Sequence, residues 1–207
     1  MRWPDGRNTG TDTMTKVEFE QVIRDLCLRG NTLDSIIPVQ IQSAIAFVER
    51  RYNFRAMQHY SALAITEPVI GLPSQFKAMV WVRIEVDDDW QYLTLSEPMT
   101  RSCIEIPDRY WIRNDKELHL WPSPDQTYDG QMLCYRYTSW ADDHWLLDRA
   151  QDVLLAKTML NMLPVLRDDN QMVAQHWQAQ FADGLQLLVE SEVEGEHGGD
   201  LELVIGD

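Results

Sequence analysis

The stretch His144–Glu192, HWLLDRAQDVLLAKTMLNMLPVLRDDNQMVAQHWQAQFADGLQLLVESE, decides the fold, because it has the pattern of two helices joined by a charged corner. Apolar residues recur at helical spacing on both sides of that corner. They are Val153, Leu154, Met159, Leu160 and Leu163 before it, and Val173, Trp177, Phe181, Leu185 and Leu188 after it. Helices joined by so short a corner are antiparallel neighbours, so a helical hairpin is expected to close the fold.

Helix-ending and helix-capping residues predict the bounds of the two helices of the hairpin. The first helix is expected over residues 145–163 and ends near Pro164. The second is expected over residues 169–192, with Asp168 or Asp169 as its cap, because carboxylates suit a helix N-terminus. Ordinary core packing explains both apolar stripes, so they indicate a fold and no particular function.

Two further helices are expected near the N-terminus. Thr15 and Glu18 match a capping box, and the helix from 15 to 29 is expected to bury one face and end at Gly30. That face holds Val17, Val22, Ile23 and Leu26. The second helix is expected over residues 38–52, with Pro38 in its first turn. Its apolar stripe is Ile41, Ala44, Ile45 and Val48, and Glu49, Arg50 and Arg51 are expected to face solvent.

Residues 59–140 have the alternation of β-strands. Strands are expected over 60–66, 79–86, 92–95, 110–113, 117–121 and 131–137, as an antiparallel meander. Val80, Val82, Ile84 and Val86 should share one side of their strand, and Leu118 and Leu120 should point away from His119 and Trp121. Turns are expected at Leu72–Phe76, at Asp87–Asp89 and at Asn114-Asp115.

The predicted fold class is therefore α+β. An antiparallel helical bundle of about four helices carries a central antiparallel β-meander and an extended C-terminal tail. Residues 1–13 are expected to be flexible, residues 14–194 to form the main domain, and residues 195–207 to form the tail. A chain of 207 residues suits one domain with an inserted subdomain. Met14 opens a well-formed helix start, so Met1 and Met14 both remain candidates for the natural initiator.

Composition narrows the function classes. The formal net charge of -15 opposes binding to a phosphate backbone and suits a surface past which DNA slides. Cys27, Cys103 and Cys134 are odd in number and lack CxxC spacing, which indicates reduced thiols in a cytosolic product. No stretch approaches the roughly 18 apolar residues of a membrane span, and the first 13 residues lack the apolar core of a signal peptide.

No residue set has the pattern of an active site. Asp87–Asp89 is a polar turn without metal-ligand spacing, and Asp142, Asp143 and His144 precede a helix, where aspartate is a cap. The other histidines, His59, His119, His176 and His197, have no partner at a recognisable spacing. Nucleophile-elbow, phosphate-loop, dinucleotide and zinc-protease motifs are absent. The sequence therefore predicts a protein that is not an enzyme and uses neither a cofactor nor a metal.

Several stretches occur in the order found in one phage family. They are Ile37-Pro38 and the helix ending in Glu49-Arg50-Arg51-Tyr52; Leu72-Pro73-Ser74-Gln75-Phe76; Glu117-Leu118-His119-Leu120-Trp121-Pro122-Ser123-Pro124; Tyr135 and Tyr137; Trp145-Leu146-Leu147; and Leu163-Pro164-Val165-Leu166-Arg167-Asp168-Asp169 with Trp177. Over roughly Thr15–Val189 the chain resembles the head-to-tail adaptor (connector) proteins of tailed bacteriophages. Their relatives are the tail tubular protein A type and the portal-docking adaptors of short-tailed phages. Gln75 replaces the usual Asp, and Ala150-Gln151 replaces a segment that often contains Pro.

The resemblance implies a structural protein of the virion neck, present in the host cytoplasm during assembly. Copies would form a ring, usually dodecameric, under the portal protein. The ring would seal the packaged capsid, give the tail or nozzle protein a platform, and let DNA pass without tight binding. The expected contacts with the portal or a neighbouring subunit are Leu201, Leu203, Val204 and Ile205 in the tail, and Trp111 and Trp121 in the β region.

Three alternatives stay open at this point. Another neck component, such as a head-completion or tail-terminator protein, would share the same composition. A small soluble enzyme would show stoichiometric metal binding or a thermal shift with divalent ions. An acidic mimic of DNA would compete with DNA for a basic host protein.

Overall fold

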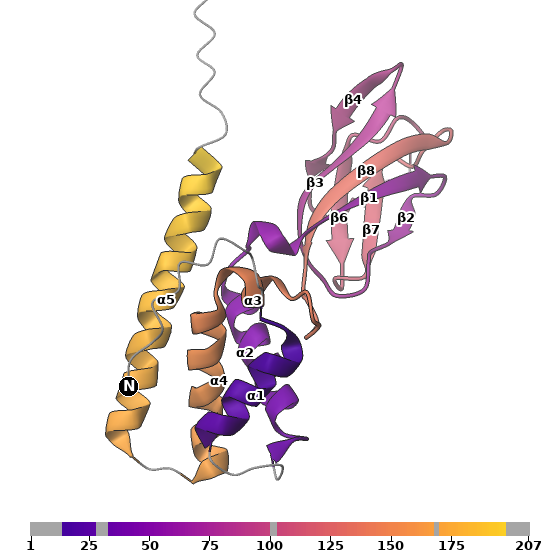
Figure 1. The fold of residues 1–207 in the computed structure, drawn as a ribbon. Coiled ribbons are helices and arrows are strands. Elements are labelled where there is room, and N and C mark those ends of the chain that lie inside the picture. The colour runs from indigo at the N-terminus through magenta and orange to yellow at the C-terminus, as the bar shows by residue number, and fades with distance from the viewer. Residues whose placement is uncertain (1–13, 28–32, 100–102, 168–169, 198–207) are drawn as a thin grey trace, which may run out of the picture. The chain divides into compact units, whose positions relative to one another are not determined.

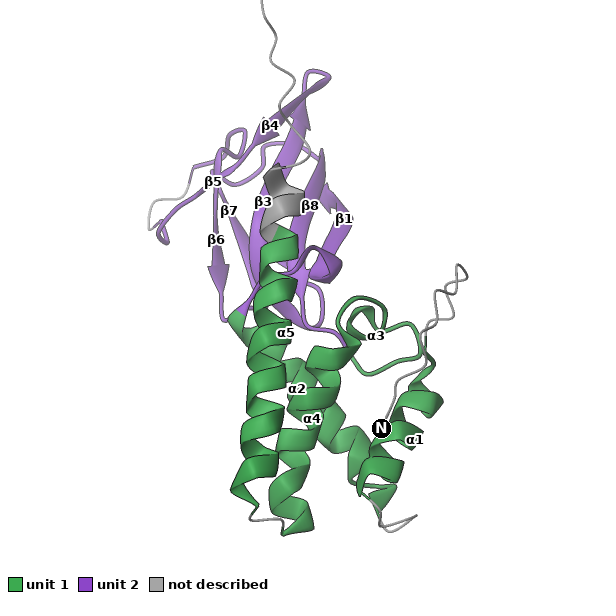
Figure 2. Cartoon of the chain, turned by 60° about the vertical axis from the view of Figure 1, so that its left-hand side comes forward, with its two compact units in different colours: residues 1–51, 139–207 green, residues 52–138 purple. Residues whose placement is uncertain are grey.

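The computed structural model describes residues 14–27, 33–99, 103–167 and 170–197. The chain forms two compact units (Figure 2). Unit 1 is helical and combines residues 1–51 with 139–207, whereas unit 2 is the β region, residues 52–138. The α+β class is confirmed, with unit 2 inserted between two helical parts of unit 1.

The described part of unit 1 contains five helices, one more than predicted (Figure 1). They are α1 (Lys16–Cys27), α2 (Ile37–Arg51), α3 (Trp145–Arg149), α4 (Gln151–Leu166) and α5 (Gln171–His197). Helix α4 contacts each of the other four, and α5 packs along it. The core of unit 1 is therefore built around α4.

Helix α1 begins at the predicted capping box. The Thr15 N–H donates to Glu18 Oε2 at 2.8 Å, and the Glu18 N–H donates to Thr15 Oγ1 at 3.3 Å. The predicted buried face is confirmed at Ile23 and wrong at Val17 and Leu26, which are 70% and 45% exposed. The buried side chains are Phe19, Ile23 and Cys27. Their spacing of four residues puts all three side chains on one side of the helix. The predicted helix end at Gly30 lies outside the described residues.

Helix α2 confirms its predicted apolar stripe, with Ile41, Ala44, Ile45 and Val48 all buried. Glu49 was expected to face solvent and is instead fully buried. Its Oε1 accepts a hydrogen bond from Trp145 Nε1 at 3.0 Å. The indole partner compensates for burying the carboxylate, and it comes from a helix 96 residues further along the chain.

The helix predicted over 145–163 is divided at Ala150, where φ is -151° and ψ is 51°. Alanine favours a continuous helix, so helix propensity does not account for the break at the buried Ala150. Helix α4 also passes the predicted end, with Pro164 in its last turn and Arg167 as a left-handed C-cap. A proline there removes only one backbone hydrogen bond, so the helix runs on to Leu166.

Helix α5 begins after Asn170 and not at Asp168 or Asp169, which lie outside the described residues. Asn170 Oδ1 accepts a hydrogen bond from the Met172 N–H at 3.1 Å, the N-cap arrangement. Leu185 and Leu188 are buried as predicted, whereas Val173, Trp177 and Phe181 are half-buried. The helix continues through Gly195 to His197, beyond the predicted end at 192.

The described part of unit 2 contains eight strands in two four-stranded sheets (Figure 1). The first sheet has the order β1-β8-β3-β4: β1 is Gln58–Ile65, β8 is Tyr128–Arg136, β3 is Phe76–Val86 and β4 is Asp89–Tyr92. The second has the order β2-β7-β6-β5: β2 is Val69–Gly71, β7 is Glu117–Trp121, β6 is Arg109–Arg113 and β5 is Thr94–Leu95. A 3₁₀ turn, Arg55–Met57, precedes β1.

The predicted meander is wrong, because β8 lies between β1 and β3. Among the strands named above, all pairs are antiparallel except β5–β6, which is parallel. A meander pairs consecutive strands, and here the last strand of the unit completes the centre of the first sheet. This long-range pairing leaves no mark on local alternation, which reports only which face of a strand is buried.

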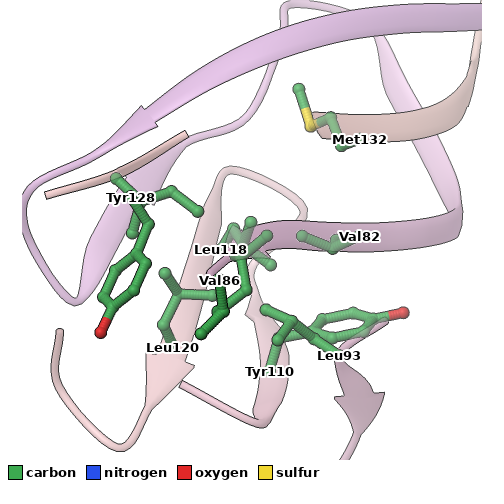
Figure 3. Packing of buried hydrophobic residues seen from close by; sticks show 10 residues of the cluster. Val82, Val86, Leu93, Tyr110, Leu118, Leu120, Tyr128 and Met132 are labelled. Atoms are coloured by element: carbon green, nitrogen blue, oxygen red, sulfur yellow. The ribbon is translucent and has the colours of Figure 1, made fainter. Parts of the chain in front are cut away.

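The two sheets share one apolar core (Figure 3). Val82, Ile84 and Val86 of β3 contribute from the first sheet, and Leu118 and Leu120 of β7 from the second. Val80 was predicted to join them but is 39% exposed. The register shifts between Met79 and Trp81, so Val80 is the extra residue of a β-bulge and the alternation restarts after it.

Two tight turns lie where turns were predicted, and one predicted strand is divided into two. Asp87 and Asp88 connect β3 to β4 with φ of 51° and 65°, the two positive values that a type I′ hairpin requires. The strand predicted over 92–95 is therefore two strands, β4 and β5, of which β4 begins at Asp89. Asn114 and Asp115, at 52° and 54°, turn the chain between β6 and β7 as predicted.

Candidate interaction surfaces

The outer face of the β2-β7-β6-β5 sheet carries Trp111 and Trp121. Leu118 and Leu120 point into the core, so the alternate residues of β7 point outward as predicted. Trp111 lies opposite His119 and the rings stack at 5.2 Å with an interplanar angle of 16°. Trp121 lies opposite Arg109, whose guanidinium is 5.4 Å from the indole centroid. The two tryptophans thus form adjacent cross-strand pairs on one half-exposed face.

The charges on this outer face are paired locally. Arg109 lies 3.5 Å from the Asp108 carboxylate, and His119 Nε2 lies 3.1 Å from Glu117 Oε2. The face is therefore an aromatic surface with neighbouring charges of both signs. Tryptophan and arginine are enriched among residues that dominate protein interfaces, so its chemistry suits contact with another protein. That Trp111 and Trp121 make such a contact remains a prediction.

A second aromatic surface lies on the outer face of the β1-β8-β3-β4 sheet, and the sequence did not reveal it. The Trp81 ring makes edge contacts with Tyr60 at 6.2 Å and with Tyr92 at 5.9 Å. Tyr60 and Tyr92 are 51% and 61% exposed. Arg83 lies among these rings, with its guanidinium 4.5 Å from Trp90 and 5.0 Å from Trp81.

Arg83 is also held from the neighbouring strand, because its Nε donates to Gln131 Oε1 at 2.8 Å. A guanidinium stacked on indoles and fixed by an amide is an ordered cation on an aromatic surface. The signal in the sequence was the outward-facing set of β3, Trp81 and Arg83, which alternates with Val82 and Ile84. Tyr60, Trp90 and Tyr92 come from other strands, so only the sheet order brings the cluster together.

The acidic stretches considered as metal sites do not form one. Asp87 and Asp88 form an exposed turn and Asp89 begins β4. Asp142 and Asp143 are exposed, and the cap of α3 is His144 and neither aspartate. Among the residues that the structure describes, no group of three or more His, Cys, Asp and Glu side chains is placed to hold a metal ion.

His144 is a buried structural residue. Its Nδ1 accepts a hydrogen bond from the Leu146 N–H at 3.2 Å, and its ring lies 5.9 Å from Trp140 and 6.1 Å from Trp145. Burial lowers the pKa of His144 to about 4, although the Asp143 carboxylate acts in the opposite direction. The imidazole is thus kept neutral, as the cap requires, because only an unprotonated nitrogen accepts a hydrogen bond.

One cysteine lies beside a histidine, a pairing that the sequence spacing did not show. Cys134 of β8 lies opposite His59 of β1, and its Sγ donates to the His59 carbonyl oxygen at 3.7 Å. Burial raises the pKa of the Cys134 thiol, the reverse of what an activated nucleophile needs. Cys27, Cys103 and Cys134 are all free thiols. The pair therefore has the chemistry of a core contact.

The remaining predicted residues are dispersed or lie beyond the description. His176 contacts Trp177 on α5 at 5.2 Å, and His197 is the last residue of that helix. The predicted tail contacts, Leu201, Leu203, Val204 and Ile205, lie outside the described residues. No helix in the described ranges is long and apolar enough to cross a membrane.

Comparison with known proteins identifies the family. The family model described as SU10 adaptor protein matches residues 14–199, which include all the described helices and strands. No curated protein matches the chain. The matched range covers most of the chain and includes both units. The chain therefore belongs to the SU10 adaptor protein family, and it is a structural adaptor protein of a bacteriophage virion.

Proposed function

We propose that the chain is the head-to-tail adaptor of a tailed phage. In this proposal its copies form a ring, usually dodecameric, below the portal protein. The ring seals the packaged capsid, gives the downstream tail or nozzle protein its attachment platform, and lets DNA pass at ejection. The family match over residues 14–199 carries this proposal.

The charge of the chain supports a passive channel. A formal net charge of -15 opposes the counterion release by which proteins retain DNA. The ring is therefore expected to let duplex DNA slide without holding it. The test is DNA binding by the purified protein at physiological salt, where no saturable complex should form. A saturable, salt-sensitive complex would argue against both the charge reasoning and the passive channel.

The portal contact is assigned to the C-terminal tail and to the outer aromatic face of unit 2. Residues 201–205 alternate Leu201, Leu203 and Ile205 with Glu202 and Val204, the pattern of a half-buried strand. Such a strand fits an edge or groove of the portal or of a neighbouring subunit, by strand addition. Trp111 and Trp121 supply the aromatic contact on the outer face of unit 2.

Co-sedimentation with purified portal tests this assignment. A chain truncated after Glu196 retains nearly all of α5 and should fold, yet its portal attachment should fall sharply. The triple change L201S, L203S and I205S should have the same effect, whereas the matched control E202S should not. Unchanged portal affinity in the truncated chain would exclude the tail from the contact and leave only the helices and unit 2 as candidates. Binding to tail tube in place of portal would indicate a tail terminator.

Mass measurement with and without portal tests the ring. The free protein is expected to be a monomer or a loose oligomer, because acidic copies repel one another until a template aligns them. Addition of portal should convert it into a complex with several copies of the chain. A stable ring in the absence of portal would refute the template part of the proposal.

A further inference from the structure

A groove on unit 1 lies between α2 and α4. One wall follows α2 from Val39 to Arg50, and the other is formed by Lys157 and Asn161 of α4. The volume is about 620 Å³. The wall on α2 extends over three turns, roughly 16 Å at 1.5 Å per residue. Its dimensions suit a few turns of a helix laid along it.

Three cations gather at one end of this groove. The Arg51 guanidinium lies 4.5 Å from the Phe47 ring centroid, and Lys157 Nζ lies 4.1 Å from the same centroid. Arg50 lines the groove beside them. Over the described ranges, none of the three forms an ion pair, whereas Arg24, Arg109 and Arg149 each do. The groove is thus a concentration of uncompensated positive charge in a chain with a net charge of -15.

The cations are also partly removed from water. Burial, and then the charge of Arg51, lower the pKa of Lys157. Both effects disfavour the charged amine, and an anion placed beside it would stabilise the charge against them. The ligand chemistry that this geometry favours is a carboxylate flanked by apolar surface, because Phe47 and Val39 supply the apolar contacts.

The matching acidic surface lies on α5. Asp183, Leu187 and Glu190 are exposed and follow one another at spacings of four and three residues, so they share one side of the helix. Leu187 is 65% exposed. The buried Leu185 and Leu188 lie on roughly the opposite side of the helix at 100° per residue. Asp183 and Leu187 also line a pocket beside Asp152 and Leu155 of α4, so the acidic side borders the packing of its own chain and stays open to solvent.

We infer that the cationic groove of one copy receives the acidic side of α5 from a second copy, with Asp183 and Glu190 paired to Arg51 and Lys157 around Leu187. The groove and the helix side are different surfaces, and α5 is held by its other side, so the contact forms only between copies. Such a heterologous contact generates a ring when the rotation closes. The inference rests on the proposed ring and names the surfaces that join its subunits.

Cross-linking of the full chain tests the contact without portal. Ser43 lines the groove and Gln186 lies beside Leu187, and both are exposed. In a chain whose native thiols are removed by C27A, C103S and C134A, the protein with S43C and Q186C should give a ladder of covalent oligomers with a short bismaleimide at high protein concentration. Either single-cysteine protein should give no ladder. Absence of a ladder from the two-cysteine protein would overturn the inference, whereas failure of portal binding alone would count only against the proposed function.

Charge reversal in the two-cysteine protein identifies the pairs. R51E with K157E should reduce the ladder by about tenfold or more, because like charges then face each other. The matched control, R113E with K116E, makes the same change in total charge at the exposed β6–β7 turn and should keep the ladder.

The decisive experiment reverses the charges of both the groove and the α5 side in one chain. Adding D183K and E190K to the R51E, K157E protein should restore the ladder. The neutral pair R51Q with K157Q checks that loss does not follow from misfolding, and it should give an intermediate yield with an unchanged helical spectrum. A ladder that survives groove reversal, or that double reversal does not restore, would overturn the assigned pairing.

Discussion

Acid should destabilise unit 1 through His144. The side chain is 4% exposed, and its Nδ1 accepts the Leu146 N–H at the start of α3. Burial lowers the pKa of His144 from 6.5 to about 4, so the folded state binds the proton less readily than the unfolded chain does. Protonation would also replace the acceptor of the cap with a second donor.

The sign and size of the effect follow from this difference in pKa. Because the folded pKa is depressed, the stability contributed by neutral His144 is complete above about pH 6.5 and is lost as the pH falls toward about 4. Each pH unit in this window costs about 1.4 kcal/mol. The loss should reach about 2 kcal/mol at about pH 5 and about 3 kcal/mol at about pH 4.

Urea titrations followed by tryptophan fluorescence would measure this loss of unfolding free energy, with wild type compared with His144→Asn. Asparagine caps a helix through its side-chain oxygen and does not titrate. Titration of the carboxylates affects both proteins equally, so it drops out of the difference in their unfolding free energies. Relative to His144→Asn, the wild-type protein should lose about 2 kcal/mol of stability between about pH 7 and about pH 5. The control His176→Asn, at an exposed position on α5, should reproduce the wild-type profile. A difference between wild type and His144→Asn that stays constant over this range would refute the reasoning.

Three further changes should alter stability in defined directions, each measured as a shift in the urea midpoint. Thr158→Val should stabilise by about 1 kcal/mol, because the buried Thr158 Oγ1 has no hydrogen-bond partner among the described residues; a loss of stability would show that the hydroxyl is satisfied. Gly184→Leu should destabilise by about 2 kcal/mol, because even a Cβ there would lie 2.7 Å from Asp152 Oδ2 and 3.0 Å from Val153 Cγ2; an unchanged midpoint would mean that α4 and α5 separate freely. Trp177→Ala should cost about 2 kcal/mol, since the ring is half-buried, and a cost below about 1 kcal/mol would place it outside the helix packing.

Local signals predicted the elements that local physics determines. The capping box at Thr15 and Glu18 forms the predicted reciprocal hydrogen bonds, and Pro38 lies in the first turn of α2. Alternation along β7 gave the buried Leu118 and Leu120. These features depend on residues within one or two turns or along one strand, so the sequence contains the required information.

Long-range contacts determined what the sequence did not reveal. Glu49 is buried because Trp145, distant in sequence, donates to it, and charge alone predicted exposure. Val80 left the core because of a bulge against β8. The same reason applies to the surfaces: Trp111 could be selected from one hairpin, whereas the rings around Arg83 come from β1, β3 and β4, whose order in the sheet has no local signature.

The pairing of β1 with β8 determines how unit 2 is joined to the rest of the chain. Gln58, near the N-terminal end of unit 2, lies opposite Tyr135, near its C-terminal end. The Cα atoms of such an antiparallel pair are about 5 Å apart, so the unit begins and ends at nearly the same place. A segment whose ends meet in this way behaves as a cassette: its loops and strands can lengthen or shorten without moving the helices that precede and follow it. A force that separates the two ends would break the β1–β8 hydrogen bonds one after another, starting from Gln58 and Tyr135, and not all together.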